Sequence, residues 1–306
     1  MPVCVNMNVK KIFLASDHAG FKLKEEIKKY LIKKKGKILD LGTINTDSVD
    51  YPDYAHLLSK KMKTIDFSNK NKYMPFVVFK PSCFGRSLLF MKLSNGDVLL
   101  EKEKDEWEKV KNRFEKVISH AINSKVKIMV DAEESWTQKI IDHLMEHLMK
   151  KYNKKETWVF TTLQMYRKDR LSYLEKLIRK CKKENFKLGI KLVRGAYLEA
   201  ENLRAQKMNY TSPICVNKSE TDKNFDAAIL IILKNLKNIL LFTGTHNERS
   251  INNIIYWMKQ NGVPKNHPNI WFAQLFGMGD HITFNLAKRK FHAVKYIPFG
   301  PFQEVL

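Results

Sequence analysis

The run LGIKLVRGAYLEAE, residues Leu188–Glu201, contains the pattern from which the fold can be predicted. Its first six residues, Leu188–Val193, form an apolar strand-like segment, and the charged Arg194 follows directly. An amphipathic stretch at Leu171–Glu184 precedes it and predicts a helix. Helices that alternate with short apolar strands are typical of parallel sheets, in which a helix connects each strand to the next.

Six other strand-like segments repeat this pattern. They are Phe76–Phe79, Val126–Val130, Thr157–Thr161, Ile239–Thr243, Ile270–Ala273 and Ala293–Ile297. Further helices are predicted at Glu103–Ser119, Thr137–Tyr152 and Arg249–Asn261. The number of repeats favours an α/β fold of the (β/α)8 barrel type over an open doubly wound sheet.

Polar residues stand where several of these segments end. They are Lys80, Asp131, Gln164, Arg194, His246 and Gln274. In a parallel barrel the carboxyl ends of the strands surround the active site. Single residues of this kind can simply mark strand boundaries, but their recurrence at successive strands favours a functional edge.

The first part of the chain has a different organisation. Ile12–Ala15, a periodic helix at Phe21–Lys34 and Lys37–Leu41 together predict one Rossmann-like βαβ unit. Hydrophobic periodicity then fades between about Ser59 and Tyr73. We therefore expect one piece at residues 1–62, a junction at 63–74 and the barrel at 75–306.

Composition narrows the class of protein. The formal charge is +23, but lysine is spread along the whole chain and no groove-reading or base-stacking motif accompanies it, so we expect no nucleic-acid partner. Cys4, Cys83, Cys181 and Cys215 form no CxxC pair, which argues against a zinc site or a disulfide framework. Without a signal peptide or an apolar span, the sequence predicts a cytoplasmic protein, with peripheral contact to the inner face of a membrane and oligomerisation left open.

Seven runs together carry a family resemblance. They are PFVVFKPSCFGRS (Pro75–Ser87), VDAEESW (Val130–Trp136), FTTLQMYRKD (Phe160–Asp169), KLVRGAYLEAE (Lys191–Glu201), GTHNE (Gly244–Glu248), FAQLFGMGDH (Phe272–His281) and VKYIPFGP (Val294–Pro301). In this order they resemble the proline dehydrogenase family over about residues 67–306. The resemblance implies a flavin barrel that oxidises L-proline to 1-pyrroline-5-carboxylate with FAD and passes electrons to a quinone.

The resemblance also implies roles for residues near the substrate. Lys80 matches a lysine that helps to bind the proline carboxylate, and Asp131 matches an aspartate that orients the cationic side chains. Tyr296 matches an aromatic residue beside the substrate, and Thr283 stands where some members carry a tyrosine that excludes hydroxyproline. The alternatives are a snorkelling surface lysine at Lys80 and a helix cap at Asp131.

A second set of residues is implied on the flavin side. Gln164 would lie near the ring, Lys191 near the reactive ring nitrogen, and Thr245 with His246 against the ring and the dinucleotide. A cation near that nitrogen would stabilise the reduced anion. Val193 and Ala196 would pack along the cofactor, with Gly195 permitting close approach. A lone histidine at a strand end is often only structural, so the role of His246 rests on its neighbours.

His143, Glu146 and His147 form an H-x-x-E-H pattern, the order of an inverted zinc-peptidase motif. They lie in the middle of a predicted helix in lysine-rich surroundings, and the sequence offers no third ligand. We therefore expect no metal.

The first piece carries another resemblance. LASDHAGFKLKEEIKKYL (Leu14–Leu31), with LDLGT and DSVDYPDYA, resembles ribose-5-phosphate isomerase B over about residues 10–62. Asp17, His18 and Tyr51 match pocket residues of that family, and the helix that begins near Gly20 offers N–H groups to an anion. The catalytic cysteine and glycine-rich cradle of that family do not follow, so the three residues are expected to be relics, with a helix cap as the alternative for Asp17 and His18.

The end of the sequence suggests an incomplete barrel. GPFQEVL stops before the helix that in the family bears an arginine pair, and the family's first barrel strand also has no counterpart. Three interpretations follow from the sequence: a proline dehydrogenase with impaired activity, a non-catalytic remnant of a gene fusion, and, least favoured, a ribose-5-phosphate isomerase, which would need the missing cysteine elsewhere in the chain.

Overall fold

The computed structural model describes residues 12–14, 16, 20–33, 38–45 and 75–296. The chain divides into two units, residues 1–73 with 298–306, and residues 74–297. In the first unit, β1 (Ile12–Leu14) and β2 (Ile38–Asp40) pair in parallel and α1 (Phe21–Lys33) connects them. The predicted βαβ unit is therefore present.

Asp40 ties that helix to its strand. It accepts hydrogen bonds from Lys24 at 2.6 Å and from Lys28 at 2.7 Å. Burial alone would raise the pKa of Asp40, but the bonds from Lys24 and Lys28 outweigh it and lower the pKa to about 2.

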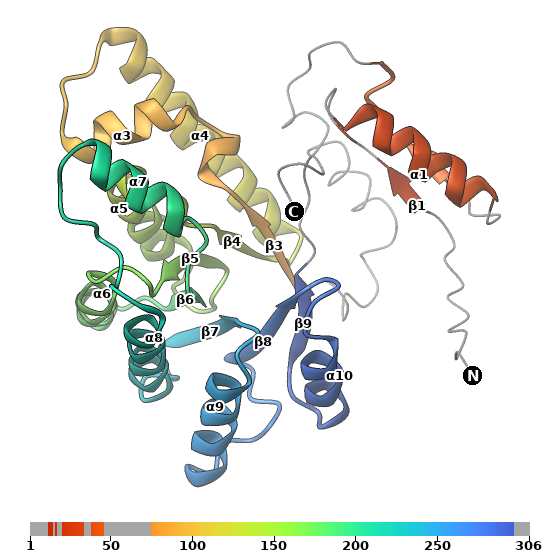
Figure 1. Cartoon of the computed structure of the whole chain (residues 1–306), viewed down its shortest axis with the longest axis vertical. Helices are drawn as coiled ribbons and strands as arrows, with labels where there is room; N and C mark the ends of the chain where they lie inside the picture. Colours follow the sequence, from red (N-terminus) through yellow and green to blue (C-terminus); the bar gives the residue numbers. More distant parts are fainter. Residues whose placement is uncertain (1–11, 15, 17–19, 34–37, 46–74, 297–306) are drawn as a thin grey trace. The chain divides into compact units, whose positions relative to one another are not determined.

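The second unit contains a sheet of seven parallel strands in sequential order. The strands are β3 (Phe76–Phe79), β4 (Lys127–Val130), β5 (Val159–Gln164), β6 (Leu188–Val193), β7 (Ile239–Gly244), β8 (Ile270–Leu275) and β9 (Ala293–Tyr296). As Figure 1 shows, the strands curl around a common interior. Parallel topology is confirmed, although the described residues supply seven strands of this barrel and not eight.

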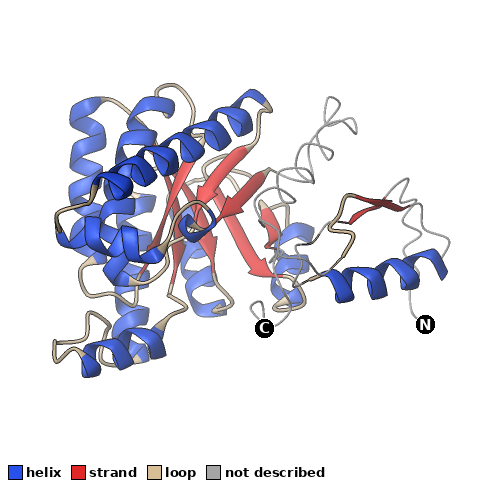
Figure 2. Ribbon diagram, turned by 90° about the horizontal axis from the view of Figure 1, so that it is seen from above, coloured by secondary structure: helices blue, strands red, loops and turns tan. Residues whose placement is uncertain are grey.

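Helices lie outside the curled sheet, where Figure 2 shows them in blue around the red strands. They are α3 (Ser87–Asn95), α4 (Glu101–Asn123), α5 (Ser135–Tyr152), α6 (Arg170–Glu184), α7 (Leu198–Lys207), α8 (Lys218–Leu233), α9 (Glu248–Gln260) and α10 (Asp280–Lys288), with a short 3-10 turn at Pro81–Cys83. Each strand is followed by at least one helix up to β9, as the alternating sequence predicts.

The two faces of the sheet follow the two-residue period of the strands. On β6, Leu188, Ile190 and Leu192 pack outward against the helices. The intervening residues face the interior, where Gly189 leaves room for Phe160, because a Cβ at Gly189 would lie 2.5 Å from the Phe160 ring. This alternation places Lys191 inside the curl, one layer above Phe160.

Phe76 shows how strongly the sheet curls. Its ring lies 5.0 Å from that of Trp271 on β8 and 5.1 Å from that of Phe242 on β7, although β3 and β8 are far apart in strand order. Phe160 contacts the same ring at 5.6 Å. These edge-on aromatic contacts fill the interior at the amino ends of the strands.

The predicted boundaries differ from the structure in a few places. β5 runs from Val159 to Gln164 and not over Thr157–Thr161, because the polar residues Thr161, Thr162 and Gln164 are buried within the strand and break the expected apolar pattern. Helices α3, α7, α8 and α10 had no sequence prediction. Among them, α8 begins at the Asn217 cap, whose side chain accepts from the Glu220 backbone, in a stretch that is polar enough to resemble a loop.

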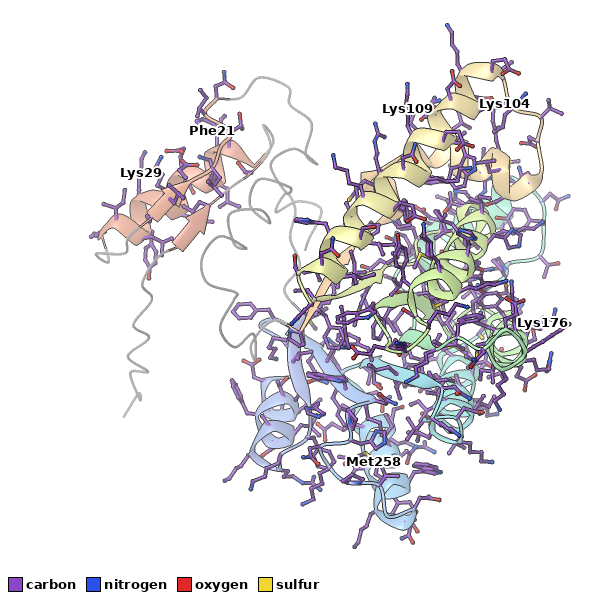
Figure 3. The ribbon with its side chains drawn as sticks, turned by 180° about the vertical axis from the view of Figure 1, so that it is seen from behind. Phe21, Lys29, Lys104, Lys109, Lys176 and Met258 are labelled. Atoms are coloured by element: carbon purple, nitrogen blue, oxygen red, sulfur yellow. The ribbon has the colours of Figure 1, made fainter. Side chains whose placement is uncertain are left out.

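The outer helices place their lysines in solvent. Figure 3 shows Lys104, Lys109 and Lys176 projecting from the outer layer, whereas Met258 on α9 is 2% exposed. The large positive charge therefore lies mainly on solvated helix faces. In the described parts of the chain, no helix combines the length and the apolar character needed to cross a bilayer.

Asn153 joins one helix to the start of two strands. It ends α5, is completely buried, and accepts from the backbone N–H groups of Trp158 and Val159, each at 2.9 Å. Its amide donates to the carbonyls of Val159 at 2.8 Å and Lys187 at 3.1 Å. One side chain thus satisfies backbone groups that open β5 and β6.

We expect Asn153→Ala to lower the free energy of unfolding by roughly 2–4 kcal/mol, because several buried backbone groups lose their partner at once. Urea denaturation followed by circular dichroism measures this. Asn261→Ala is the matched control, since Asn261 is exposed and donates a single bond to the Trp257 carbonyl; its cost should stay below about 1 kcal/mol. If both variants lost the same free energy of unfolding, the proposed role of Asn153 in joining α5 to β5 and β6 would be wrong.

Candidate active site

A buried ion pair lies inside the sheet at the carboxyl ends of the strands. Lys191 on β6 donates a short hydrogen bond to Asp131, the residue that follows β4. The side chains of Lys191 and Asp131 are only 8% and 14% exposed. Each charge therefore depends on the other, because loss of one partner would leave the second buried and uncompensated.

Tyr296, the last residue of β9, completes this cluster. Its hydroxyl donates to the second oxygen of Asp131 at 3.0 Å, and the Lys191 Nζ lies 4.4 Å from the centre of its ring. Burial and the negative charge of Asp131 raise the pKa of Tyr296, so the phenol stays protonated and can donate. Three residues predicted from sequence thus come together from three strands.

Lys80 follows β3 and faces Tyr197, with its Nζ 5.9 Å from the ring centre. Burial would lower the pKa of Lys80, but Tyr197, Glu133 and Asp131 outweigh it and raise the pKa. Lys80 is therefore a stable cation near the Asp131 cluster. The sequence analysis missed Tyr197; the available signal was its place directly after the Gly195–Ala196 turn.

Glu133 was also missed. Its carboxylate accepts from the backbone N–H of Ser82 at 2.9 Å and from the Ser82 hydroxyl at 2.6 Å. Burial raises the pKa of Glu133, while the two bonds from Ser82 oppose that change. The loops after β3 and β4 are therefore joined at the mouth of the curled sheet.

Gln164, predicted to lie beside a flavin ring, is 2% exposed and bonded at both ends of its amide. Its Nε2 donates to the Glu133 carbonyl at 2.7 Å, and its Oε1 accepts from the Ala196 backbone at 3.2 Å. Gln164 thus holds the loops that follow β4 and β6.

The turn after β6 requires glycine at one position. Gly195 has a φ of 137°, and a Cβ there would lie 2.5 Å from the ring of Tyr166. Val193 is partly buried at the end of β6, and Ala196 is exposed. Glycine at this position thus makes room for the Tyr166 ring, and contact of Val193, Gly195 and Ala196 with a cofactor stays a prediction.

A cavity of about 350 Å³ lies at the amino ends of α8 and α9. Four cationic side chains line it, from Arg194, Lys218, Lys223 and Arg249, against two carboxylates, from Asp222 and Asp226. Helix amino termini add unpaired N–H groups and the positive end of the helix dipole. The charge and geometry suit an anionic group such as a phosphate.

Arg194 connects this cavity to the strand ends. It donates to Asp222 at 2.7 Å, to the Thr245 hydroxyl at 2.8 Å and to the Ser250 hydroxyl at 3.1 Å, and it stacks 4.3 Å above the Phe225 ring. The sequence analysis had named Arg194 only as a strand end. Its position in the run KLVRG, directly after β6, was the sequence feature that could have indicated this role.

His246 follows Thr245 at the end of β7 and is exposed, whereas Thr245 is buried. Partial burial and the positive charge of Lys295 lower the pKa of His246, so the neutral imidazole is favoured near neutral pH. Of the two residues predicted to contact the cofactor, only His246 is therefore exposed to solvent.

Thr283 is buried on α10, and its hydroxyl donates to the Gln274 side chain at 2.7 Å. Gln274 in turn donates to the Thr245 carbonyl at 3.1 Å. Thr283 therefore fixes Gln274 beside the predicted cofactor residues, and an effect on hydroxyproline stays a prediction.

Other predicted residues lie elsewhere. Asp17, His18 and Tyr51 fall outside the described residues. In the H-x-x-E-H pattern, Glu146 accepts from Tyr173 at 3.0 Å and from Lys180 at 2.6 Å. Within the ranges that the structure describes, no group of three or more His, Cys, Asp or Glu residues is arranged to hold a metal.

The comparisons with known proteins match most of this chain. The family model described as proline dehydrogenase matches residues 25–306. The carbapenem antibiotics biosynthesis protein CarD of Pectobacterium carotovorum is 32% identical over 84% of this chain and 66% of its own length. The mitochondrial proline dehydrogenase 1 of Dictyostelium discoideum is 36% identical over 72% of this chain and 40% of its own length. The chain thus spans between two fifths and two thirds of these relatives.

Solved structures agree in fold. Proline utilization A (PutA) of Bdellovibrio bacteriovorus, inactivated by N-propargylglycine, has a TM-score of 0.70 and 17% identity over 94% of this chain and 30% of its own. A PutA mutant of Bradyrhizobium japonicum has a TM-score of 0.66 and 20% identity over 82% of this chain and 25% of its own.

The isomerase resemblance of residues 10–62 receives no support from these matches, and the family model already begins at residue 25, inside that stretch. The extent of the family match, with the parallel curled sheet and its strand-end cluster, shows that this chain belongs to the proline dehydrogenase family.

Proposed function

We propose that this protein carries out FAD-dependent oxidation of L-proline to 1-pyrroline-5-carboxylate in proline catabolism. The observation that carries the proposal is the cluster of Lys80, Asp131, Lys191 and Tyr296 at the strand ends, beside a cationic cavity. The alternatives are a non-catalytic fusion remnant and, with less support, a ribose-5-phosphate isomerase that uses the relic residues of the first piece, residues 1–62.

The residues present fit a flavin dinucleotide. The cavity lined by Arg194, Lys218, Lys223 and Arg249 offers positive charge to a pyrophosphate. Arg194, which lines the cavity, donates to the Thr245 hydroxyl, and Gln164 accepts from the Ala196 backbone. We assign Thr245, His246, Gln164 and the Gly195–Ala196 turn to the rest of the cofactor. When bound, FAD supplies the acceptor for a hydride from the carbon next to the substrate nitrogen.

The protein's own residues would bind and orient the substrate. Lys80 is an exposed cation that can meet the proline carboxylate through charge-assisted hydrogen bonds. Asp131 holds Lys191 and Tyr296 in fixed positions through its two oxygens. The buried charge of Lys191 favours the accumulation of negative charge nearby, which is the electrostatic requirement of this reaction.

The electron acceptor and the location of the protein are proposed from the family resemblance. A quinone is the expected electron acceptor, which fits peripheral contact of a cytoplasmic protein with a membrane. We retain the expectation that no nucleic acid is a partner, because the lysines are spread over outer helix faces and form no groove-reading motif.

The visible absorption spectrum of the purified protein tests the proposal. Bound flavin should bleach when L-proline is added without oxygen. Lys80→Met should raise the proline concentration for half-bleaching by about tenfold or more, because a charge-assisted contact with the carboxylate is lost. Lys176→Met, on the outer face of α6, is the control and should leave it unchanged.

Bound flavin that does not bleach would support the non-catalytic alternative. A protein that binds no flavin, even when FAD is added in excess, would contradict the proposed function as a whole.

The cavity makes a separate prediction about the cofactor. Arg249 lines it, is exposed, and has no hydrogen-bond or ion-pair partner among the described residues. Arg249→Gln should therefore leave the fold intact and weaken FAD binding by about tenfold, the value of one hydrogen bond to a charged group. Titration of apoprotein with FAD, followed by flavin fluorescence, measures the Kd. Lys259→Gln on the same helix lies outside the cavity and should keep the original Kd; an equal change in both variants would place the pyrophosphate elsewhere.

A further inference from the structure

Helix α5 begins without a cap of its own. Its N-cap residue, Glu134, makes no side-chain capping bond. Instead Glu201, which is 66 residues away on α7, accepts from the Ser135 backbone N–H at 2.5 Å and from the Ser135 hydroxyl at 2.6 Å. Both carboxylate oxygens are thus committed to the first residue of α5.

The environment of Glu201 is unusual for a carboxylate. The residue is 0% exposed, and within the described ranges no lysine, arginine or histidine forms an ion pair with it. A buried charge without a counterion is costly unless other dipoles stabilise it. Here the amino terminus of the 18-residue helix α5 takes that role, through its free N–H groups and the positive end of its dipole.

The bond connects two loops that the sheet does not bring together directly. Ser135 follows the segment Asp131–Glu134 after β4, and Glu201 lies in the first turn of α7, where its backbone N–H bonds to the Tyr197 carbonyl. Strand β5 separates β4 from β6 in the sheet. Gln164, at the end of β5, crosses between the same loops closer to the interior.

We propose that Glu201 is a positioning residue, which holds the loop of Asp131 and Glu133 against the loop of Ala196 and Tyr197. This inference rests on the proposed function. Glu201 touches neither the Lys191 pair nor Lys80, so it acts through the loops alone. Because the Asp131 loop and Tyr197 flank Lys80, a small shift between them displaces the groups that bind and orient the substrate.

Glu201→Gln tests the proposal, with Glu199→Gln as the matched control. Glutamine keeps the size of the side chain but replaces one acceptor oxygen with a donor and removes the charge. Glu199 is on the same helix, is exposed, and has no hydrogen-bond or ion-pair partner among the described residues. We expect kcat/KM for L-proline to fall by about tenfold to a hundredfold in Glu201→Gln, the scale of a misplaced site, and to change less than about twofold in Glu199→Gln.

Ser135→Ala separates positioning from general destabilisation. It removes the hydroxyl bond and keeps the backbone N–H, so a smaller loss than in Glu201→Gln is expected. If Glu201 acts through Ser135, the double variant should be no less active than Glu201→Gln alone. Losses that multiply in the double variant would overturn the proposal. Ser135→Ala also provides the test if Glu201→Gln does not fold.

Amide hydrogen exchange gives a readout that does not depend on activity. Residues 131–138 should exchange faster in Glu201→Gln than in Glu199→Gln, because the cap of α5 is lost. Unchanged exchange in this segment would overturn the proposal. If exchange responds as expected but no variant, including the original protein, oxidises proline, the proposed function fails while the link between the loops stands.

Discussion

The site depends on one constraint, the burial of a lysine charge inside a parallel sheet. Lys191 can occupy the interior only because Asp131 reaches it from a strand two places away. Removing one member of such a pair typically costs about 3–5 kcal/mol, because the remaining charge has no partner and little water. The positions of β4 and β6, and of the loops that follow them, must therefore satisfy this pair before they can serve a ligand. Tyr296 extends the same constraint to β9, since its hydroxyl occupies the second oxygen of Asp131.

A second group of charges is organised differently. Arg194 is shared among Asp222, Thr245 and Ser250 and rests on the Phe225 ring, so its guanidinium is held rigidly at one end of the cationic cavity. Arg249 lines the same cavity without a partner in the described chain. The arrangement combines a fixed cation near the strand ends with a freer cation farther out. An anionic group in this cavity would thus meet one cation that three partners hold in place and one that can adjust its position.

Much of this could be predicted from the sequence, for physical reasons. The alternation of apolar strands and helices fixed the parallel topology, and the two-residue period places Lys191 inside once β6 is recognised. The family runs identified Lys80, Asp131 and Tyr296, which the structure brings together. Other features required three dimensions. The Glu201–Ser135 bond joins residues 66 positions apart, and Gln164 is a brace because two backbone groups converge on it. Glu133 and Tyr197 look like ordinary loop residues until their neighbours are known. Helix α8 shows where prediction from local sequence fails, because its polar first turn resembles a loop.

The aromatic rings around Phe76 form an apolar floor inside the curled sheet. Phe76, Phe160, Phe242 and Trp271 close the interior at the amino ends of the strands, with ring centres 5.0–5.6 Å from that of Phe76. Among the described residues, these rings make that end of the interior apolar, whereas the buried pair lies toward the carboxyl ends of the strands. A ligand at the buried pair would therefore rest on an apolar floor, and its polar groups would have to be matched by the side chains at the strand ends, Asp131, Lys191 and Tyr296.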